Sequence, residues 1–209
     1  MPLRQRRVPL LRTTVLIVAA LAVVTGTTGC GGPSNDKVGI IGDSITDLSR
    51  TPLQTALGSD HHIEIVGKFG ARSDQVIDDV KVIAASDPAE AVINIGTNDA
   101  LQQVPVAQTE ANIGKILDLL DGADCVFLVQ INEGITDVAS GASRQAEAKA
   151  INDALTSLAS KHDGVTVIPW NRDIAEHGGA GAITYDTVHL SEKGLVVLAD
   201  TYKSALASC

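Results

Sequence analysis

Ser44 directly follows a short apolar run and belongs to the sequence Gly42-Asp43-Ser44. A serine at the exit of a buried strand can present its hydroxyl to a cleft, and the small Gly42 lets the backbone turn there. Such a hydroxyl becomes a nucleophile when a neighbouring base takes its proton. The alternative is that Ser44 only caps a helix, a common task for serine. Ser44 is therefore a candidate nucleophile, and this segment by itself does not decide between the two roles.

Asp186 and His189 supply the kind of base that such a serine needs. They lie three positions apart near the end of the chain, a spacing that lets both side chains share one side of a turn. The carboxylate would then accept a hydrogen bond from one ring nitrogen and leave the other nitrogen free as a base. A histidine without an acidic partner is more often an ordinary surface or core residue, so Asp186 is what favours a catalytic interpretation.

A third polar segment, Asn94-Ile95-Gly96-Thr97-Asn98-Asp99, ends another apolar run. The amide of Asn98 can donate to a developing oxyanion without bringing a charge, which suits an electrostatic stabiliser of acyl transfer. In the alternative interpretation, Asn98 and Asp99 only satisfy backbone groups of their own loop, as asparagine and aspartate often do in turns.

Together these segments resemble the GDSL/SGNH family of serine hydrolases, in their order and in their approximate spacing. Gly42-Asp43-Ser44 resembles the nucleophile block, Gly96-Thr97-Asn98-Asp99 the block with the oxyanion asparagine, and Asp186 with His189 the block with acid and base. The family also has a glycine block after its second strand. Gly70 in Phe69-Gly70-Ala71-Arg72-Ser73 is the candidate, although Gly67 lies nearby.

The resemblance implies a mechanism for these residues. Ser44 would attack an acyl carbonyl, His189 would take its proton, and Asp186 would orient the histidine. The backbone N–H groups of Ser44 and Gly70 and the side-chain amide of Asn98 would hold the oxyanion. No metal or organic cofactor is required. His61-His62 is not expected to bind a metal, since no cysteine or carboxylate cluster accompanies it.

The elements that must position these residues follow from the apolar pattern. Continuous β-branched runs predict five strands buried on both faces: Val38–Gly42, Ile63–Val66, Ala91–Ile95, Cys125–Ile131 and Val165–Ile168. Apolar residues at helical spacing predict four helices between and after them: Ser73–Ala85, Val106–Leu120, Ser143–His162 and Ser191–Ser208.

This alternation predicts an α/β fold with three layers, in which helices cover both faces of a five-stranded parallel sheet. The resemblance implies the flavodoxin-like arrangement of SGNH hydrolases for residues 38–209. In such sheets ligands bind beyond the carboxyl ends of the strands. Each polar segment described above lies where a strand ends or shortly before the last helix, so the segments are expected to meet there.

The first thirty residues have a different character. Four arginines precede an apolar run from Val15 to Val24, which is too short to span a bilayer as a helix and is typical of an export signal. Thr27-Thr28-Gly29-Cys30 resembles a bacterial lipobox, although leucine is usual where Thr27 stands. We therefore expect a lipoprotein signal peptide at 1–29, a lipidated tether at 30–37 that begins at Cys30, and a domain at 38–209. The alternative is a membrane anchor that is never removed.

Charge, aromatic content and cysteine content indicate which partners the domain can bind and whether it can form a disulfide. The formal net charge is −9, and removing residues 1–29, which hold four arginines and no acidic residue, would make it −13. Such a domain is not expected to bind nucleic acid. Only five residues are aromatic, which argues against a long sugar-stacking groove.

Outside the cytoplasm Cys125 and Cys209 can pair, because the last helix should run antiparallel to the strands and bring its end near the start of the strand that begins at Cys125. The alternative is one buried and one terminal thiol.

These observations lead to a functional expectation. The chain is expected to be an exported enzyme, held by its lipid on the outer side of the cell membrane, that cleaves short acyl esters on an envelope sugar or lipid. The same serine could instead pass the acyl group to a sugar hydroxyl, which would make the protein an O-acyltransferase. A third possibility, from another class of protein, is a surface lipoprotein that binds a ligand without catalysis.

Overall fold

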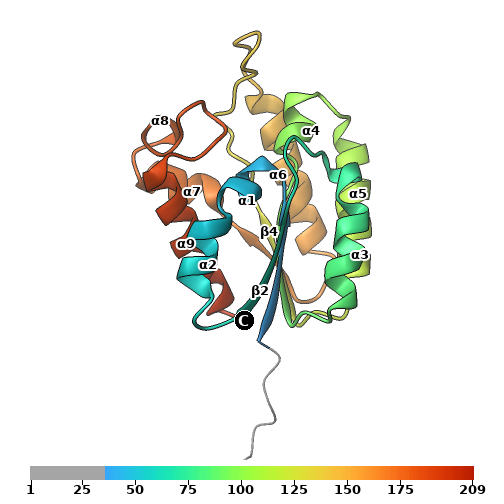
Figure 1. Cartoon of the computed structure of the whole chain (residues 1–209). Coiled ribbons are helices and arrows are strands. Elements are labelled where there is room, and N and C mark those ends of the chain that lie inside the picture. Colours follow the sequence, from blue (N-terminus) through green and yellow to red (C-terminus); the bar gives the residue numbers. More distant parts are fainter. Residues whose placement is uncertain (1–35) are drawn as a thin grey trace, which may run out of the picture. The chain divides into compact units, whose positions relative to one another are not determined.

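A computed structural model describes residues 36–209 of the chain (Figure 1). The expected signal peptide, Cys30 and most of the expected tether lie outside the described residues. The first strand, β1, begins at Lys37, so the last residue of the expected tether already belongs to the domain. Among residues 36–209, no helix combines the length and the apolar character that crossing a bilayer requires.

The five predicted strands are present and form one parallel sheet. They are β1 (Lys37–Gly42), β2 (His62–Gly67), β3 (Glu90–Asn94), β4 (Cys125–Val129) and β5 (Val165–Ile168). Their order in the sheet is β2-β1-β3-β4-β5, with every neighbouring pair parallel. The predicted three-layer α/β/α fold is therefore confirmed, and every strand end lies within two residues of its predicted position.

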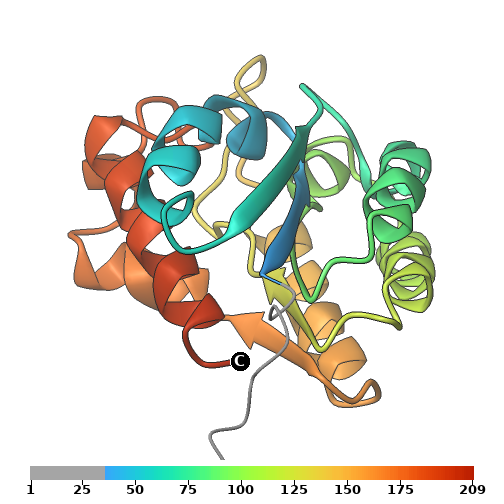
Figure 2. The same ribbon diagram turned by 60° about the horizontal axis from the view of Figure 1, so that its bottom comes forward.

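Helices cover both faces of this sheet (Figures 1 and 2). One face packs against α3 (Ile77–Ala85), α5 (Val106–Leu119) and α6 (Gln145–Ala159), and the other against α1 (Ser44–Leu48), α2 (Arg50–Leu57), α7 (Trp170–Glu176) and α9 (Glu192–Leu206). The short helices α4 (Thr97–Leu101) and α8 (Ala180–Ile183) and a 3-10 turn, η1 (Ser73–Gln75), complete the described elements.

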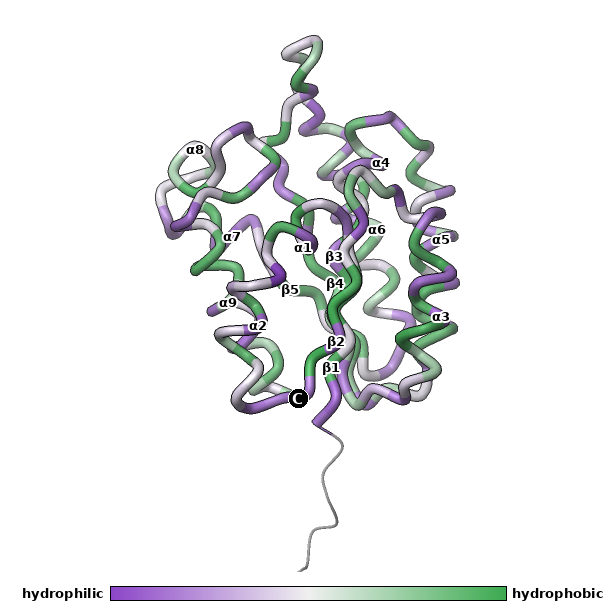
Figure 3. Tube along the Cα trace, viewed as in Figure 1, coloured by the Kyte–Doolittle hydropathy of each residue, from purple (hydrophilic) through white to green (hydrophobic). Residues whose placement is uncertain are grey.

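Alternate strand residues feed the two hydrophobic cores. Ile41, Ile93 and Leu128 pack under α3, α5 and α6, whereas Ile40 and Val92 pack under α2 and α9. All five are at most 2 % exposed. The central strands β1, β3 and β4 are buried on both faces and read as continuous apolar runs, whereas the edge strands β2 and β5 are partly exposed and include Glu64 and Thr166. Figure 3 shows the strands as mainly hydrophobic between amphipathic helices.

The predicted helices are present, with one division and several additions. The helix predicted over Ser73–Ala85 divides into η1 and α3, while α1, α2, α4, α7 and α8 were not predicted. Four of these five span no more than seven residues, about two turns, which is too short for a hydrophobic period to repeat.

Strand β1 marks the point at which the order of the sheet reverses. The chain goes from β1 to β2 on one side and then crosses to β3 on the other, so the segments that leave β1 and β3 separate at the carboxyl edge. Gly42 and Asn94, the last residues of these two strands, are in register, and Asp43 N–H donates to Asn94 O (3.3 Å). Such a reversal is where open α/β sheets bind their ligands.

Cys125 and Cys209 are joined by a disulfide, with their Cα atoms 6.1 Å apart. It ties the end of the chain, just after α9, to the first residue of β4. The bond lies at the amino edge of the sheet, which is the edge opposite the switch point, and Figure 1 shows the C-terminus there. It therefore restrains α9 at the end remote from the polar segments.

Candidate active site

Ser44 is the first residue of α1 and lies directly beyond β1. The carboxylate of Asp43 caps this helix by accepting from Ile45 N–H (2.9 Å). Only glycine fits two positions before the serine, because a side chain at Gly42 would meet Asn94 O at 2.5 Å and collide with the hydroxyl of Thr46. The first N–H groups of a helix have no partner within it, so the N–H of Ser44 is not used by a hydrogen bond inside α1.

His189 meets Ser44 from the other end of the chain. Ser44 Oγ lies 3.0 Å from His189 Nε2, and His189 Nδ1 lies 2.6 Å from Asp186 Oδ2. The ionised carboxylate can only accept, so Nδ1 carries the proton and Nε2 is left to accept from the hydroxyl of Ser44. The three side chains thus form one connected line in the order that a nucleophile, its base and an orienting acid require.

The carboxylate of Asp186 is held by more than the histidine ring. Its Oδ1 accepts from the N–H groups of Val188 (3.0 Å) and His189 (2.6 Å). Partial burial by itself raises the pKa of Asp186, but the hydrogen bonds from the ring and from these two backbone groups outweigh it and leave the pKa below its ordinary value. Asp186 is therefore ionised at neutral pH.

Gly70 occupies a tight turn beside the serine. Ala71 N–H donates to Lys68 O (3.1 Å), and Gly70, the third residue of this turn, has φ +71°. A type II turn requires a positive φ at that position, which glycine adopts without strain. The turn's own hydrogen bond does not use the N–H of Gly70. Gly67, the alternative considered from sequence, lies instead at the end of β2 against the backbone of Asp47.

Asn98 lies in α4 and reaches this turn. Its Nδ2 donates to Ala71 O (3.0 Å) and lies 3.4 Å from Asp43 Oδ2. The first bond fixes which side-chain atom is the nitrogen, since a carbonyl oxygen can only accept. The second contact is long for a hydrogen bond. Asn98 thus connects the segment after β3 with the segments after β1 and β2.

Asp99 holds the same segment from the buried side. Its carboxyl group accepts from Ser73 N–H (2.8 Å), from the Ser73 hydroxyl and from the hydroxyl of Thr109 (3.0 Å), and Asn112 donates to the Ser73 hydroxyl. All four side chains are buried. Sequence analysis gave Asp99 no more than a loop role; it acts across two elements, which spacing along the chain does not show.

Two further buried groups surround the switch point. Desolvation raises the pKa of Asp43 to about 7, against the opposing effect of its helix-capping bond and of nearby His189. Asn94 Nδ2 donates to the hydroxyl of Tyr202 in α9 (2.9 Å), and burial raises the pKa of Tyr202 far above its ordinary range. Tyr202 therefore remains a neutral anchor between the last helix and the end of β3.

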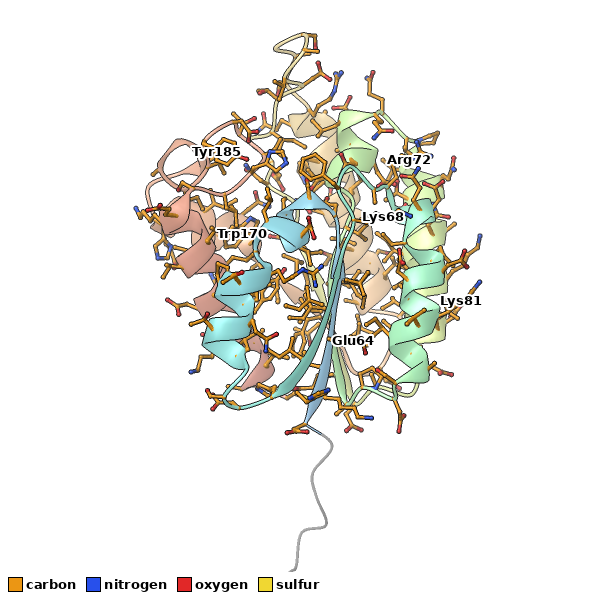
Figure 4. The ribbon with its side chains drawn as sticks, viewed as in Figure 1. Glu64, Lys68, Arg72, Lys81, Trp170 and Tyr185 are labelled. Atoms are coloured by element: carbon orange, nitrogen blue, oxygen red, sulfur yellow. A yellow bond between two sulfur atoms is a disulfide. The ribbon has the colours of Figure 1, made fainter. Side chains whose placement is uncertain are left out.

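Exposed rings flank the histidine. Phe69 and Tyr185 both stack on His189, with ring centroids 5.8 and 5.7 Å from it, and they are 69 % and 66 % exposed. Figure 4 shows Tyr185 at the carboxyl edge of the sheet. Trp170, the first residue of α7, is in contrast buried in the same hydrophobic cluster as residues of α9. Phe69 directly precedes the candidate Gly70, and no signal in the sequence indicates that its ring stacks on His189.

A cavity of about 410 Å³ lies elsewhere, between β5, α7 and α9. Its lining includes Phe127, Asp173 and Thr201 but none of the residues around Ser44. No group of three histidine, cysteine, aspartate or glutamate side chains suited to a metal ion occurs in residues 36–209. The convergence of Ser44, His189 and Asp186 is therefore the arrangement with the clearest chemistry.

Comparison with known proteins agrees with this geometry. Residues 40–195 match the sequence pattern of the GDSL-like lipase/acylhydrolase family. The match covers most of the chain and includes every polar segment described above, so the chain belongs to this family of SGNH-type esterases and acylhydrolases. No curated protein matches its sequence.

Solved structures with the same fold come from several bacteria. A lipase/acylhydrolase from Enterococcus faecalis has 17 % identity and a TM-score of 0.72, covering 82 % of this chain and 95 % of its own. The catalytic domain of a peptidoglycan O-acetyltransferase from Streptococcus pneumoniae has 24 % identity and a TM-score of 0.64, covering 83 % and 93 %. A catalytic mutant of an acetylxylan esterase from Geobacillus stearothermophilus has 16 % identity and a TM-score of 0.66, covering 82 % and 94 %.

The buried carboxyl of Asp43 predicts a pH dependence of stability. A carboxyl whose pKa rises from 3.8 to about 7 on folding binds its proton more tightly in the folded state. The free energy of unfolding should therefore fall as the pH rises between these values, by about 4 kcal/mol from this group, and then level off. Asp43→Asn has no carboxyl at this position and should lose this pH dependence. The difference in the free energy of unfolding between the two proteins should therefore change by about 4 kcal/mol over this pH range. Denaturant titrations across this pH range measure it, and parallel curves for the two proteins would contradict the prediction.

Proposed function

We propose that Ser44, His189 and Asp186 form the catalytic triad of a carboxylic ester hydrolase. The observation that carries this proposal is the 3.0 Å contact between Ser44 Oγ and His189 Nε2, with Asp186 bound to the opposite ring nitrogen. Two residues far apart along the chain share a hydrogen bond whose donor and acceptor are fixed by the third residue. This is the arrangement by which a base activates a serine hydroxyl.

The reaction would proceed through an acyl-serine. Ser44 Oγ attacks the ester carbonyl as its proton passes to His189 Nε2, and the resulting imidazolium is stabilised by Asp186. The protonated histidine then gives that proton to the leaving alcohol oxygen. Water, deprotonated by His189, attacks the acyl carbon, and the carboxylic acid and the free serine are released.

Three donors are proposed for the oxyanion: the N–H of Ser44 at the helix start, the N–H of Gly70 in its turn, and the side-chain amide of Asn98. One hydrogen of that amide is used by Ala71 O, which keeps the amide oriented. The other faces Asp43 at 3.4 Å, a weak contact that a negatively charged oxygen can replace at little cost.

The proposed substrate is a short acyl ester on a sugar or lipid of the cell envelope. The exposed rings of Phe69 and Tyr185 beside His189 offer apolar faces for one sugar unit, which does not require a long groove. Two of the relatives with this fold, the peptidoglycan O-acetyltransferase and the acetylxylan esterase, are named for acetyl groups on polysaccharides. The strongly acidic composition disfavours polyanionic substrates.

Transfer of the acyl group to a sugar hydroxyl is the second candidate, because the relative from Streptococcus pneumoniae is an O-acetyltransferase. Both reactions share the acyl-serine and differ only in the acceptor. Product analysis with and without a sugar acceptor separates them, since a transferase yields acylated sugar in place of free acid. A non-catalytic ligand-binding lipoprotein, in contrast, would form no covalent adduct with an acyl analogue.

The location is also a proposal. A signal peptide over residues 1–29 and a lipid on Cys30 would hold the domain at the outer face of the cell membrane through a short tether. The support is in the sequence: arginines, a short apolar run and Gly29-Cys30. A lipid anchor would keep the enzyme close to envelope esters without spanning the bilayer.

Replacement of the proposed nucleophile gives the first functional test. Ser44→Ala should abolish ester cleavage and labelling by a fluorophosphonate, because no other residue supplies the attacking oxygen, while circular dichroism shows a folded domain. Ser49→Ala is the matched control, since Ser49 directly follows the same helix and its hydroxyl only donates to Ile45 O. Undiminished turnover in Ser44→Ala would remove Ser44 from the mechanism.

The oxyanion proposal has its own test. Asn98→Ala should lower kcat about 10²- to 10³-fold with a smaller change in KM, since the donor acts chiefly on the transition state. Steady-state kinetics on an acetyl ester measure both constants. A kcat equal to that of the wild-type enzyme would mean that Asn98 only supports the loop through Ala71.

The anchor is tested in cells. Cys30→Ser in the full chain should move the protein from the membrane fraction to the soluble fraction, because no thiol remains to carry a lipid, and the released protein should keep its specific activity. Fractionation with immunodetection checks this outcome. Retention of the variant in the membrane fraction would indicate an uncleaved N-terminal segment instead.

A further inference from the structure

Thr187 lies inside the turn that carries Asp186 and His189, and its backbone has φ +71°. Only two other non-glycine residues in the described part of the chain have a positive φ, Asp87 and Gln103. For a β-branched residue this conformation is a genuine outlier, because the branched side chain crowds the backbone. Such a conformation persists only where surrounding contacts hold it.

The contacts that hold Thr187 come from one loop, residues 132–136. Asn132 Nδ2 donates to Thr187 O (2.9 Å), and Thr136 N–H donates to Thr187 Oγ1 (3.1 Å). The hydroxyls of Thr136 and Thr187 are also hydrogen-bonded, at 2.9 Å. Loop 132–136 therefore binds both the backbone and the side chain of the strained residue.

Loop 132–136 is itself anchored to the domain. Asn132 is buried, and its Oδ1 accepts from Gly134 N–H (2.8 Å), which fixes the amide that faces Thr187. Just before the loop, Ile131 exchanges two hydrogen bonds with the side chain of Asn152 in α6. Val188 packs in the same buried cluster as Ile131 and Ile135. The support of Thr187 thus reaches back to α6 and the core.

The conformation of Thr187 determines where the next residues point. Asp186 Oδ1 receives the N–H groups of both Val188 and His189, which requires the chain to fold back sharply after Asp186. A relaxed φ at Thr187 would carry these N–H groups and the imidazole away from the carboxylate. The bond between His189 and Ser44 depends on the same fold.

We propose that Asn132 and Thr136 are positioning residues, which hold Thr187 in its left-handed conformation and thereby hold Asp186 and His189 in reach of Ser44. The proposal rests on the proposed catalytic function of those three residues. The proposal predicts that activity depends on Asn132 because Thr187 is strained. Removing that strain should therefore make activity largely independent of Asn132.

A double-mutant cycle on the full chain tests this coupling. With Thr187 present, Asn132→Ala should lower kcat about 10- to 100-fold with little change in KM, since a displacement near 1 Å is enough for such a loss. In a Thr187→Gly background the same replacement should cost only about 3-fold, because glycine adopts a positive φ freely. Thr136→Val, which replaces the hydroxyl by a methyl group and keeps the backbone N–H bond to Thr187, should show the same pattern at smaller size and covers the case in which Asn132→Ala fails to fold.

A matched control separates this coupling from a general gain in stability. Gln103→Gly relieves a similar positive φ (55°) outside the turn and should leave the loss caused by Asn132→Ala unchanged. In Asn132→Ala the downfield NMR signal of the His189 Nδ1 proton should broaden or disappear while the thermal midpoint shows a folded protein, a signature that a merely structural role would not give.

Equal losses in the Thr187 and Thr187→Gly backgrounds, or an unchanged proton signal in Asn132→Ala, would overturn the proposal. Its failure differs from a failure of the proposed function. If Ser44→Ala is inactive and the cycle shows no coupling, only the positioning role is wrong, whereas an active Ser44→Ala variant refutes the triad itself.

Discussion

The hydrogen bond between Ser44 and His189 joins two residues 145 positions apart, and most of the domain is arranged so that it can form. Ser44 is fixed because β1 lies between β2 and β3 in the sheet. His189 is fixed because α9, which follows it, is capped by Ser191, bound to Asn94 through Tyr202 and tied by the disulfide at its far end. The reversal of strand order at β1 separates the segments that leave the sheet there, and Ser44 and His189 meet at this carboxyl edge.

The carboxyl edge of the sheet around β1 and β3 contains several buried polar side chains. Asp43, Asn94, Asp99 and Tyr202 are all at most 3 % exposed, yet each has hydrogen-bond partners from another segment. A buried polar network that is satisfied specifies one arrangement, since any other would leave groups unpaired. Asp43 does this at a cost, because its raised pKa means that its charged form is disfavoured by burial. Ionisation of Asp43 is therefore expected to lower the free energy of unfolding near neutral pH.

The sequence was sufficient to predict the sheet and the meeting of the candidate residues Ser44, Asp186 and His189, for a physical reason. Central strands buried on both faces must be continuously apolar, and the two edge strands still carry β-branched apolar residues, so all five runs were visible. Parallel strands carry their polar exits to one edge. Helices as short as α1 and α4 were missed because their start depends on one capping residue or one glycine, such as Asp43 and Gly96, rather than on a repeating pattern. That Gly67 ends β2 while Gly70 lies in the following turn depends on where the strand stops, which no local signal provides.

The backbone conformation of Thr187 could not be predicted from the sequence, for a stronger reason. Local preference favours glycine at a positive φ and disfavours threonine, so the sequence points to the wrong conformation at this position. What threonine adds is a hydroxyl, and that hydroxyl connects the turn to Thr136. Thr136 also pairs with Ser143 to close the hairpin that projects beyond the carboxyl edge in Figure 1, where Val138 is 74 % exposed. Thr136 therefore belongs both to a surface hairpin and to the support of Asp186 and His189. The hydroxyl of Thr187 links the geometry of the proposed triad to that hairpin. A glycine at 187 would relieve the strain but would also remove that link.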